Sequence, residues 1–293
     1  MMKLSSRSDK VAKVIAYVCV VIVLLIVVLP LLNLVAVALS TETEVVGGRV
    51  TFWPKGLQFD AFGYIFSTQR FLTALKNSAL LTVVGTAASL ISTCLAAYTL
   101  SRKNLPGRRI IMLFFIFSML FSGGIIPTYL LIMRLGLLNS FASLIFVSCV
   151  SVYNLLIMKN YFEGLPMEIE ESARIDGARP IVIFFRIALP LATPVLATIG
   201  LFYAVGYWNE YFNARMYITK QQQILLQPYL QAVIFEASDP TGAFRMDAAK
   251  VSGVGSKSLI NATVVCVMLP ICILYPFLQR YFVSGVVLGS VKG

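Results

Sequence analysis

The sequence predicts an all-α membrane protein with six transmembrane helices, and three observations carry this prediction. Hydrophobic residues make up 58% of the 293 residues and charged residues only 13%, whereas ordinary globular proteins have about 45–50% and about 25%. The mean hydropathy is +0.84. Six charge-free runs reach the length of about 20 residues that a helix needs to cross a bilayer. So few charges could not cover the surface of a soluble protein, which disfavours a soluble enzyme or a nucleic-acid-binding domain.

The six runs define one membrane domain over residues 1–293. Its predicted spans cover residues 14–39, 77–100, 110–133, 137–158, 187–209 and 258–279. The third span contains Ser122-Gly123-Gly124 and then Pro127, so we expect it to kink or unwind there. A further run, Gln221–Phe235, is too short to span and holds Pro228, which favours an amphipathic surface segment.

The distribution of lysine and arginine predicts the orientation. An even number of spans places both termini on one side, and the basic residues gather in four short segments of that side. These are Lys3, Arg7, Lys10 and Lys13; Arg102, Lys103, Arg108 and Arg109; Lys159, Arg174, Arg179 and Arg186; and Arg280 and Lys292. The positive-inside rule then makes both termini and the loop 159–186 cytoplasmic, and the loop 210–257 extracytoplasmic. The net charge of +11 is therefore a topology signal, and no nucleic-acid partner is expected.

Residues that could carry catalysis are missing from the spans. Histidine is absent from the chain, and the spans hold no carboxylate pair and no cluster of metal ligands, so we expect neither a catalytic nor a metal site. A phosphate-binding loop is also absent; the nearest approach, residues 253–258, lacks the glycine before Lys257. Uphill transport by this chain would need an energy source on another subunit.

The cytoplasmic loop 159–186 carries the most informative pattern. Pro166 and the acidic residues after it suit the first turn of a helix, and Glu170 and Arg174 have the spacing of an ion pair. Gly177 is suited to ending this helix, and Arg179-Pro180 to starting the next one. The helix could dock another protein or be a solvated connection, and physical arguments alone leave both open.

The spacing Glu171-x-Ala173-x3-Gly177, followed after nine residues by Ile187-x-Leu189-Pro190, resembles the EAA loop of ABC importer permeases. Ser172 replaces the first alanine of that motif. Two further stretches resemble the maltose-type carbohydrate-uptake permeases, in particular the second permease subunit of oligosaccharide importers (the LplC/YtcP-like group). They are Ala204–Asn209 and the C-terminal tail from Gln279 to Gly293.

The resemblance implies a non-catalytic subunit of an importer in the bacterial cytoplasmic membrane, moving an oligosaccharide or polysaccharide fragment by alternating access. It implies a second homologous permease, two ATPase subunits that hold ATP and Mg, and an extracytoplasmic solute-binding protein. The cytoplasmic helix would be a coupling helix between the fourth and fifth spans, with Glu171 paired to a basic residue of the ATPase. The implied coupling residues are Glu170, Glu171, Ser172, Ala173, Arg174, Asp176, Gly177, Leu189 and Pro190; the tail contacts are Gln279, Arg280, Gly285 and Lys292.

Polar and aromatic residues near the outer end of the fifth span are candidates for the substrate pathway. Aromatic faces, amides and carboxylates are the groups that hold sugars, and those present are Tyr203, Tyr207, Trp208, Asn209 and Glu210, with Asn154 in the fourth span. An aromatic belt or helix packing is the favoured alternative for this cluster. The polar segment from Ser238 to Lys257 could dock the binding protein or be a solvated loop.

Two other functions compete with sugar import. The same machinery could carry a non-sugar solute, which the loop motif does not exclude. A stand-alone secondary transporter would require buried ionisable residues and inverted repeats, and the spans contain almost no such residues.

Overall fold

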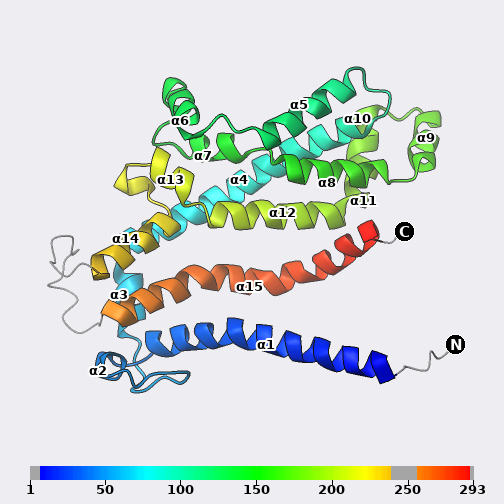
Figure 1. Cartoon of the computed structure of the whole chain (residues 1–293). Coiled ribbons are helices and arrows are strands. Elements are labelled where there is room, and N and C mark those ends of the chain that lie inside the picture. The colour runs from blue at the N-terminus through cyan, green and yellow to red at the C-terminus, as the bar shows by residue number, and fades with distance from the viewer. Residues whose placement is uncertain (1–6, 239–255, 291–293) are drawn as a thin grey trace. The chain divides into compact units, whose positions relative to one another are not determined.

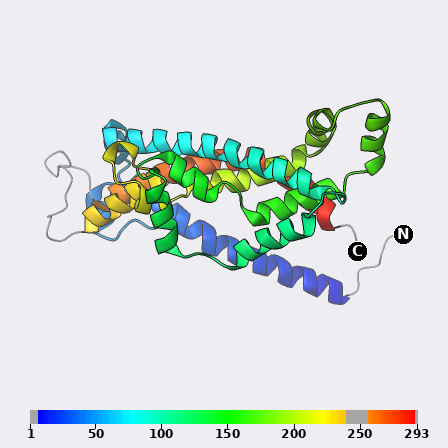
Figure 2. The same ribbon diagram turned by 90° about the horizontal axis from the view of Figure 1, so that it is seen from above.

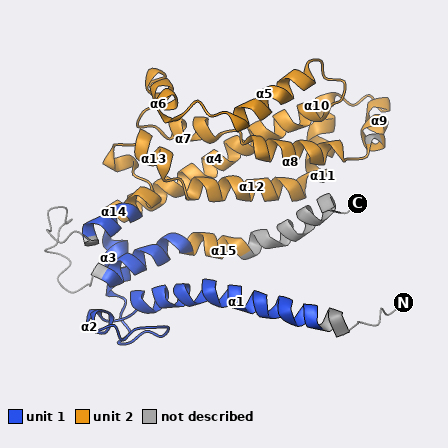
Figure 3. Ribbon diagram, viewed as in Figure 1, with its two compact units in different colours: residues 1–69, 230–268 blue, residues 70–229, 269–293 orange. Residues whose placement is uncertain are grey.

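The structure, a computed structural model, describes residues 7–238 and 256–290, with side chains over 11–166, 168–236 and 257–275. Within these ranges every regular element is a helix and no strand occurs, as predicted (Figures 1 and 2). The chain divides into two compact units, one of residues 1–69 and 230–268 and one of residues 70–229 and 269–293 (Figure 3). Each unit is described separately.

The first unit holds α1 (Arg7–Ala38), α2 (Glu42–Val46) and α3 (Asp60–Ser67), with most of α14 (Leu226–Ser238) and the first part of α15 (Ser256–Ser290). The apolar part of α1, Val11–Ala38, has 28 residues, so it is long enough to cross a bilayer. The loop after α1 is tied down by Ser40, whose hydroxyl donates to the Ala36 carbonyl at 2.6 Å and accepts from the Lys55 amide at 2.9 Å. The end of α1 is therefore held by hydrogen bonds as well as by packing.

The second unit begins with the long helix α4. Its elements are α4 (Gln69–Ser101), α5 (Arg108–Leu120), α6 (Ile125–Arg134), α7 (Phe141–Ser148), α8 (Val152–Glu163), α9 (Met167–Ile175), α10 (Pro180–Ile183), a π-helix (Phe184–Ala188), α11 (Leu189–Leu191), α12 (Thr193–Trp208), α13 (Phe212–Tyr217) and a 3-10 turn (Gln221–Gln223). In both views α9 lies at the end of this unit opposite α13 (Figures 1 and 2). Fully buried Leu81, Leu155, Met158 and Ile199 place the core between α4, α8 and α12.

Three helices and three bent helix pairs have the length and hydropathy of spans. The helices are α1, α4 and α15, and the pairs are α5 with α6, α7 with α8, and residues 180–191 with α12. The axes within the pairs differ by 114°, 54° and 79° respectively. The described residues therefore supply up to six spans when each pair counts as one, which agrees in number with the sequence prediction.

The kink predicted in the third span is present. α5 ends at Leu120 and α6 begins at Ile125, with Gly124 at a φ of 87° between them. The sequence analysis did not predict the breaks in the fourth and fifth spans. At the first, the Ser151 hydroxyl accepts from the amide of Asn154 at 3.4 Å and so caps α8. At the second, Pro194 follows the break at Ala192 and cannot donate a helical hydrogen bond.

The predicted extracytoplasmic loop 210–257 is structured in its first half. Asn77 of α4 donates to the carbonyl oxygens of Gln222 and Ile224 at 2.9 and 3.0 Å, which holds the 3-10 turn against α4. The helix α14 then buries Leu226, Tyr229 and Val233 along one face, as predicted for an amphipathic segment. Residues 239–255, including most of the segment considered for binding-protein docking, lie outside the described residues.

The last predicted span is extended in the structure. α15 continues past residue 279 to Ser290, so its backbone includes Gln279, Arg280 and Gly285 of the predicted tail contacts. Lys292 lies outside the described residues.

Candidate functional site

The short helix predicted in the cytoplasmic loop is present as α9. Pro166 precedes its first residue, one position earlier than predicted, and Gly177 follows it with a φ of 81°. That left-handed conformation favours glycine, and it lets the Ala178 amide donate to the Ala173 carbonyl at 2.9 Å. Pro180 then opens α10, so a turn lies at each end of α9.

One side of α9 is anchored by an ion pair to Arg102, the residue that directly follows α4. The Arg102 guanidinium donates to both carboxylate oxygens of Glu170, with 2.7 Å between Nη2 and Oε1. Arg102 also lies over the ring of Tyr98, 4.0 Å from its centroid, and Glu170 is 8% exposed. The expected pairing of Glu170 with Arg174 is therefore wrong. A bidentate pair with Arg102 is geometrically better than an i,i+4 contact between two flexible side chains.

The other side of α9 is exposed. Glu171, Ser172 and Arg174 are exposed, as are Asp176 and Gly177 beyond the helix, and Ala173 is half-buried. Ile175 is 86% exposed, which is unusual for an isoleucine in a packed protein. Anchored on one side and exposed on the other, α9 presents charged, small and apolar groups as one surface.

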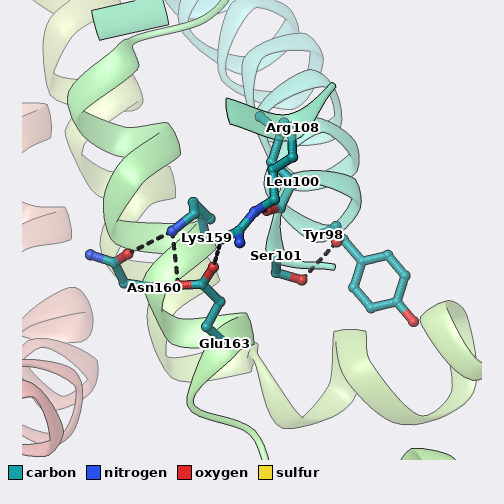
Figure 4. A network of polar contacts seen from close by, with 7 residues as sticks. All are labelled: Tyr98, Leu100, Ser101, Arg108, Lys159, Asn160 and Glu163. Carbon is teal, nitrogen blue, oxygen red and sulfur yellow. Dashed lines mark hydrogen bonds and ion pairs between the residues drawn. The ribbon is translucent and has the colours of Figure 1, made fainter. Parts of the chain in front are cut away.

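A second polar network joins residues of α4, α5 and α8 (Figure 4). The Glu163 carboxylate accepts from Arg108 and, at 2.8 Å, from Lys159. Arg108 also donates through Nε to the Leu100 carbonyl at 2.7 Å, which satisfies an acceptor at the end of α4. The sequence analysis used Arg108 and Lys159 only for orientation and so missed this network. The spacing of Glu163, one helical turn after Lys159, could have predicted the ion pair between these two residues.

The remaining coupling-motif residues lie on packed helix and not in a solvated loop. Leu189 is half-buried and Pro190 is exposed, both in α11 just before the bend at Ala192. The Tyr161 hydroxyl donates to the Leu191 carbonyl at 2.9 Å, which links α8 to this bend. The segment between α9 and α12 is therefore a bent, packed helix.

Two of the candidate pathway tyrosines pack α12 against α4. The hydroxyls of Tyr203 and Tyr207 share hydrogen bonds with Thr93 at 2.6 Å and Ser89 at 2.8 Å. The Tyr203 oxygen also accepts from the Ser151 amide at 3.0 Å, at the break between α7 and α8. Their hydroxyls thus have the helix-packing role that the sequence analysis favoured.

The same tyrosines also line a cavity of about 500 Å3, together with Asn154 and Glu210. Four of the six candidate pathway residues are therefore neighbours around one space. Trp208 lines a separate apolar pocket of about 50 Å3, and Asn209 is exposed and accepts from Gln227 at 3.2 Å. Tyr217 lies in α13, beyond α12. Burial raises the pKa of its phenol, and the charge of Glu210 adds a smaller contribution in the same direction. The phenol therefore stays protonated at neutral pH.

The chain is similar to known membrane components of transport systems over most of its length. The profile of the family "Binding-protein-dependent transport system inner membrane component" matches residues 88–287. Protein LplC of Bacillus subtilis (strain 168) is 44% identical over 90% of this chain and 89% of its own length. The polygalacturonan/rhamnogalacturonan transport system permease protein YtcP of the same organism is 40% identical over 90% of this chain and 92% of its own length.

A solved structure has the same fold. It belongs to a bacterial ABC transporter involved in the import of the acidic polysaccharide alginate. The TM-score is 0.88 at 31% identity, over 96% of this chain and 100% of the other.

Proposed function

The chain belongs to the family of inner membrane components of binding-protein-dependent transport systems, and on this premise we propose that it is a permease subunit of a carbohydrate importer. The substrate class is an oligosaccharide or polysaccharide fragment. The observation that carries the proposal is the fold shared over 96% of the chain with a subunit of an alginate importer. Its relative YtcP, named for polygalacturonan and rhamnogalacturonan transport, supports the same substrate class.

Membership of this family supports three kinds of partner. A second permease completes the pathway, two ATPase subunits bind and hydrolyse ATP with Mg, and an extracytoplasmic binding protein delivers the saccharide. This chain is non-catalytic: it supplies the moving helices, and energy enters from the ATPases. Both termini and α9 are cytoplasmic, in accord with the positive-inside rule.

The exposed surface of α9 is the ATPase contact. Glu171 pairs with a basic residue of the ATPase, while Ser172 and Ala173 allow close approach and Gly177 forms the turn. Because Glu170 is bonded to Arg102, movement of α9 carries α4 with it. Closure of the ATPase pair would thus rock the membrane helices, which is the mechanical step of alternating access. The tail residues Gln279, Arg280, Gly285 and Lys292 reach between the ATPase subunits.

Purification of the tagged full-length chain in mild detergent, from membranes of its host, tests the assembly. Mass spectrometry should identify an ATPase with a phosphate-binding loop and a second permease with an EAA loop. Proteoliposomes of that complex, supplied with the binding protein, should import a saccharide in an ATP-dependent manner. Recovery of a stable chain with no ATPase would overturn the proposal.

A further inference from the structure

The cavity beside α12 has the size and lining of a ligand site. Its volume of about 500 Å3 falls within the range of about 300–1,000 Å3 found for small-molecule sites. It lies where the helix breaks between α7 and α8, and Val150 and Ser151 from the break are part of its wall. Irregular backbone at membrane depth is tolerated where it lines a polar cavity. The cavity fits a short stretch of a chain-like solute, not a whole polysaccharide.

Asn154 supplies an unused hydrogen-bonding group to this cavity. The residue is 5% exposed and lines the space. Its backbone amide donates to Ser151, but among the described residues its side-chain amide has no hydrogen-bond partner. The side-chain atoms of Asn154 are accessible from the cavity, so they can hydrogen-bond a polar occupant.

Glu210 brings a carboxylate to the cavity, and no cation among the described residues pairs with it. Its carboxylate accepts from the amide and side chain of Asn213, both at 3.0 Å. Within the part of the chain that the structure describes, no lysine or arginine is ion-paired with it, and none lines the cavity. A carboxylate in such a place accepts hydrogen bonds from hydroxyl groups and repels other carboxylates.

The cavity also offers aromatic surface. Tyr153 and Phe202 line it with 57% and 37% of their surface exposed. Their ring faces can cover the C–H face of a sugar ring while the amide and carboxylate bond its hydroxyls. Together these groups match an uncharged, hydroxyl-rich solute.

Resting on the importer function proposed above, we propose that this cavity is a sugar-contact site of this subunit, specific for an uncharged stretch of saccharide. Asn154 and Glu210 hydrogen-bond its hydroxyls, and the carboxylate of Glu210 selects against uronate residues. In this respect the chain would differ from its relatives named for alginate and polygalacturonan, which are polymers of acidic sugars.

Transport by the complete importer in proteoliposomes tests this proposal, with neutral arabino-oligosaccharides and acidic oligogalacturonides of equal chain length as probes. Wild type should import the neutral probe preferentially. Asn154→Leu, which keeps the branched shape but removes the amide, should raise the KM for the neutral probe about tenfold. Glu210→Gln should raise the rate for the acidic relative to the neutral probe about tenfold or more. The matched control is Glu42→Gln, an exposed carboxylate outside the cavity, which should change neither quantity.

Thermal unfolding of each detergent-purified complex distinguishes a loss of folding from a loss of sugar contact. Neither cavity variant should shift the unfolding temperature enough to explain its transport defect. A wild-type complex that imports one probe, with both variants unchanged in KM and in probe preference, would overturn the cavity site alone. Wild-type import of the acidic probe at the neutral rate would overturn the selectivity. Import of neither probe, nor of any other saccharide, would instead overturn the importer function.

Discussion

Glu170 and Glu171 are adjacent carboxylates with opposite surroundings. Glu170 is 8% exposed and bonded to Arg102, whereas Glu171 is exposed on the other side of α9. A helical turn of 3.6 residues separates neighbouring side chains by about 100°, so one can anchor the helix while the next faces outward. Glu170 therefore holds α9 in place, whereas Glu171 is accessible for the ATPase contact proposed above.

The anchor predicts a charge-swap result. Arg102→Glu places two carboxylates together at a largely buried site, and loss of the pair should cost about 1–3 kcal/mol locally and reduce transport at least tenfold. The double variant Arg102→Glu/Glu170→Arg should recover a substantial part of transport, since it restores the pair in reverse. Transport and ATPase activity of the reconstituted complex measure both. Lys103→Glu, at an exposed neighbour, is the control. A double variant no better than the single variant would contradict the anchoring role.

Glu171 predicts a different defect. Glu171→Lys should abolish transport by repelling the basic ATPase residue proposed as its partner, while membrane insertion and the amount of protein stay normal. Glu168→Lys, on the same helix and also exposed, should transport at a rate close to wild type. Gly177→Asp should behave like Glu171→Lys, because aspartate is strained at a φ of 81°. Normal transport by Glu171→Lys would remove the coupling role from α9.

Helices α4 and α12 are held close by small residues facing tyrosines. A Cβ added at Gly85 would lie 2.8 Å from ring atoms of Tyr207, which is 3% exposed. The ring cannot swing away cheaply, because its hydroxyl is bonded to Ser89 at 2.8 Å. The glycine is thus required by the close approach of the two helices.

This packing predicts that Gly85→Ala destabilises the protein. Overpacking of this kind costs about 1–3 kcal/mol, so the unfolding temperature in detergent should fall. Gly63→Ala is the matched control, since Gly63 is also helical but a Cβ there meets nothing within 4 Å. Alanine is the better helix former, so the control should be neutral or slightly stabilising. Equal unfolding temperatures for wild type and Gly85→Ala would show that α4 and α12 can separate without cost.

Most elements were predictable where local chemistry decides them and not where tertiary contacts do, although the break before Pro194 had a local signal that the sequence analysis missed. Gly123-Gly124 and Pro127 predicted the break between α5 and α6, and Gly177 predicted the end of α9. The break at residues 149–151 had no comparable signal, because its amide at Ser151 is satisfied by Tyr203, over 50 residues away in the sequence. Glu170 is a second example. Its spacing to Arg174 suggested an ion pair within the helix, but Glu170 is paired with Arg102, which is distant in the sequence.

For the whole molecule, hydropathy predicted the number of apolar segments, because the bilayer fixes their length. It could not predict that three of them are bent pairs, with angles of 114°, 54° and 79°. The candidate site was also only partly predictable. Asn154 and Glu210 could be recognised in the sequence as unusual residues, but the cavity that they line forms only when α8 and α12 pack together.

The charges of the loops predict the side of the membrane on which each loop lies. The loop between α4 and α5 carries Arg102, Lys103, Arg108 and Arg109, so it should be cytoplasmic, and the 3-10 turn Gln221–Gln223 should face outward. In a variant whose five cysteines are replaced by alanine, Gln221→Cys should react with a membrane-impermeant thiol reagent added to intact cells. Asn104→Cys should react only after the membrane is opened. Both positions are exposed, so a lack of reaction reports the side of the membrane and not burial in this chain. The reverse pattern would place α9 outside the cell, where no ATP-driven subunit could reach it.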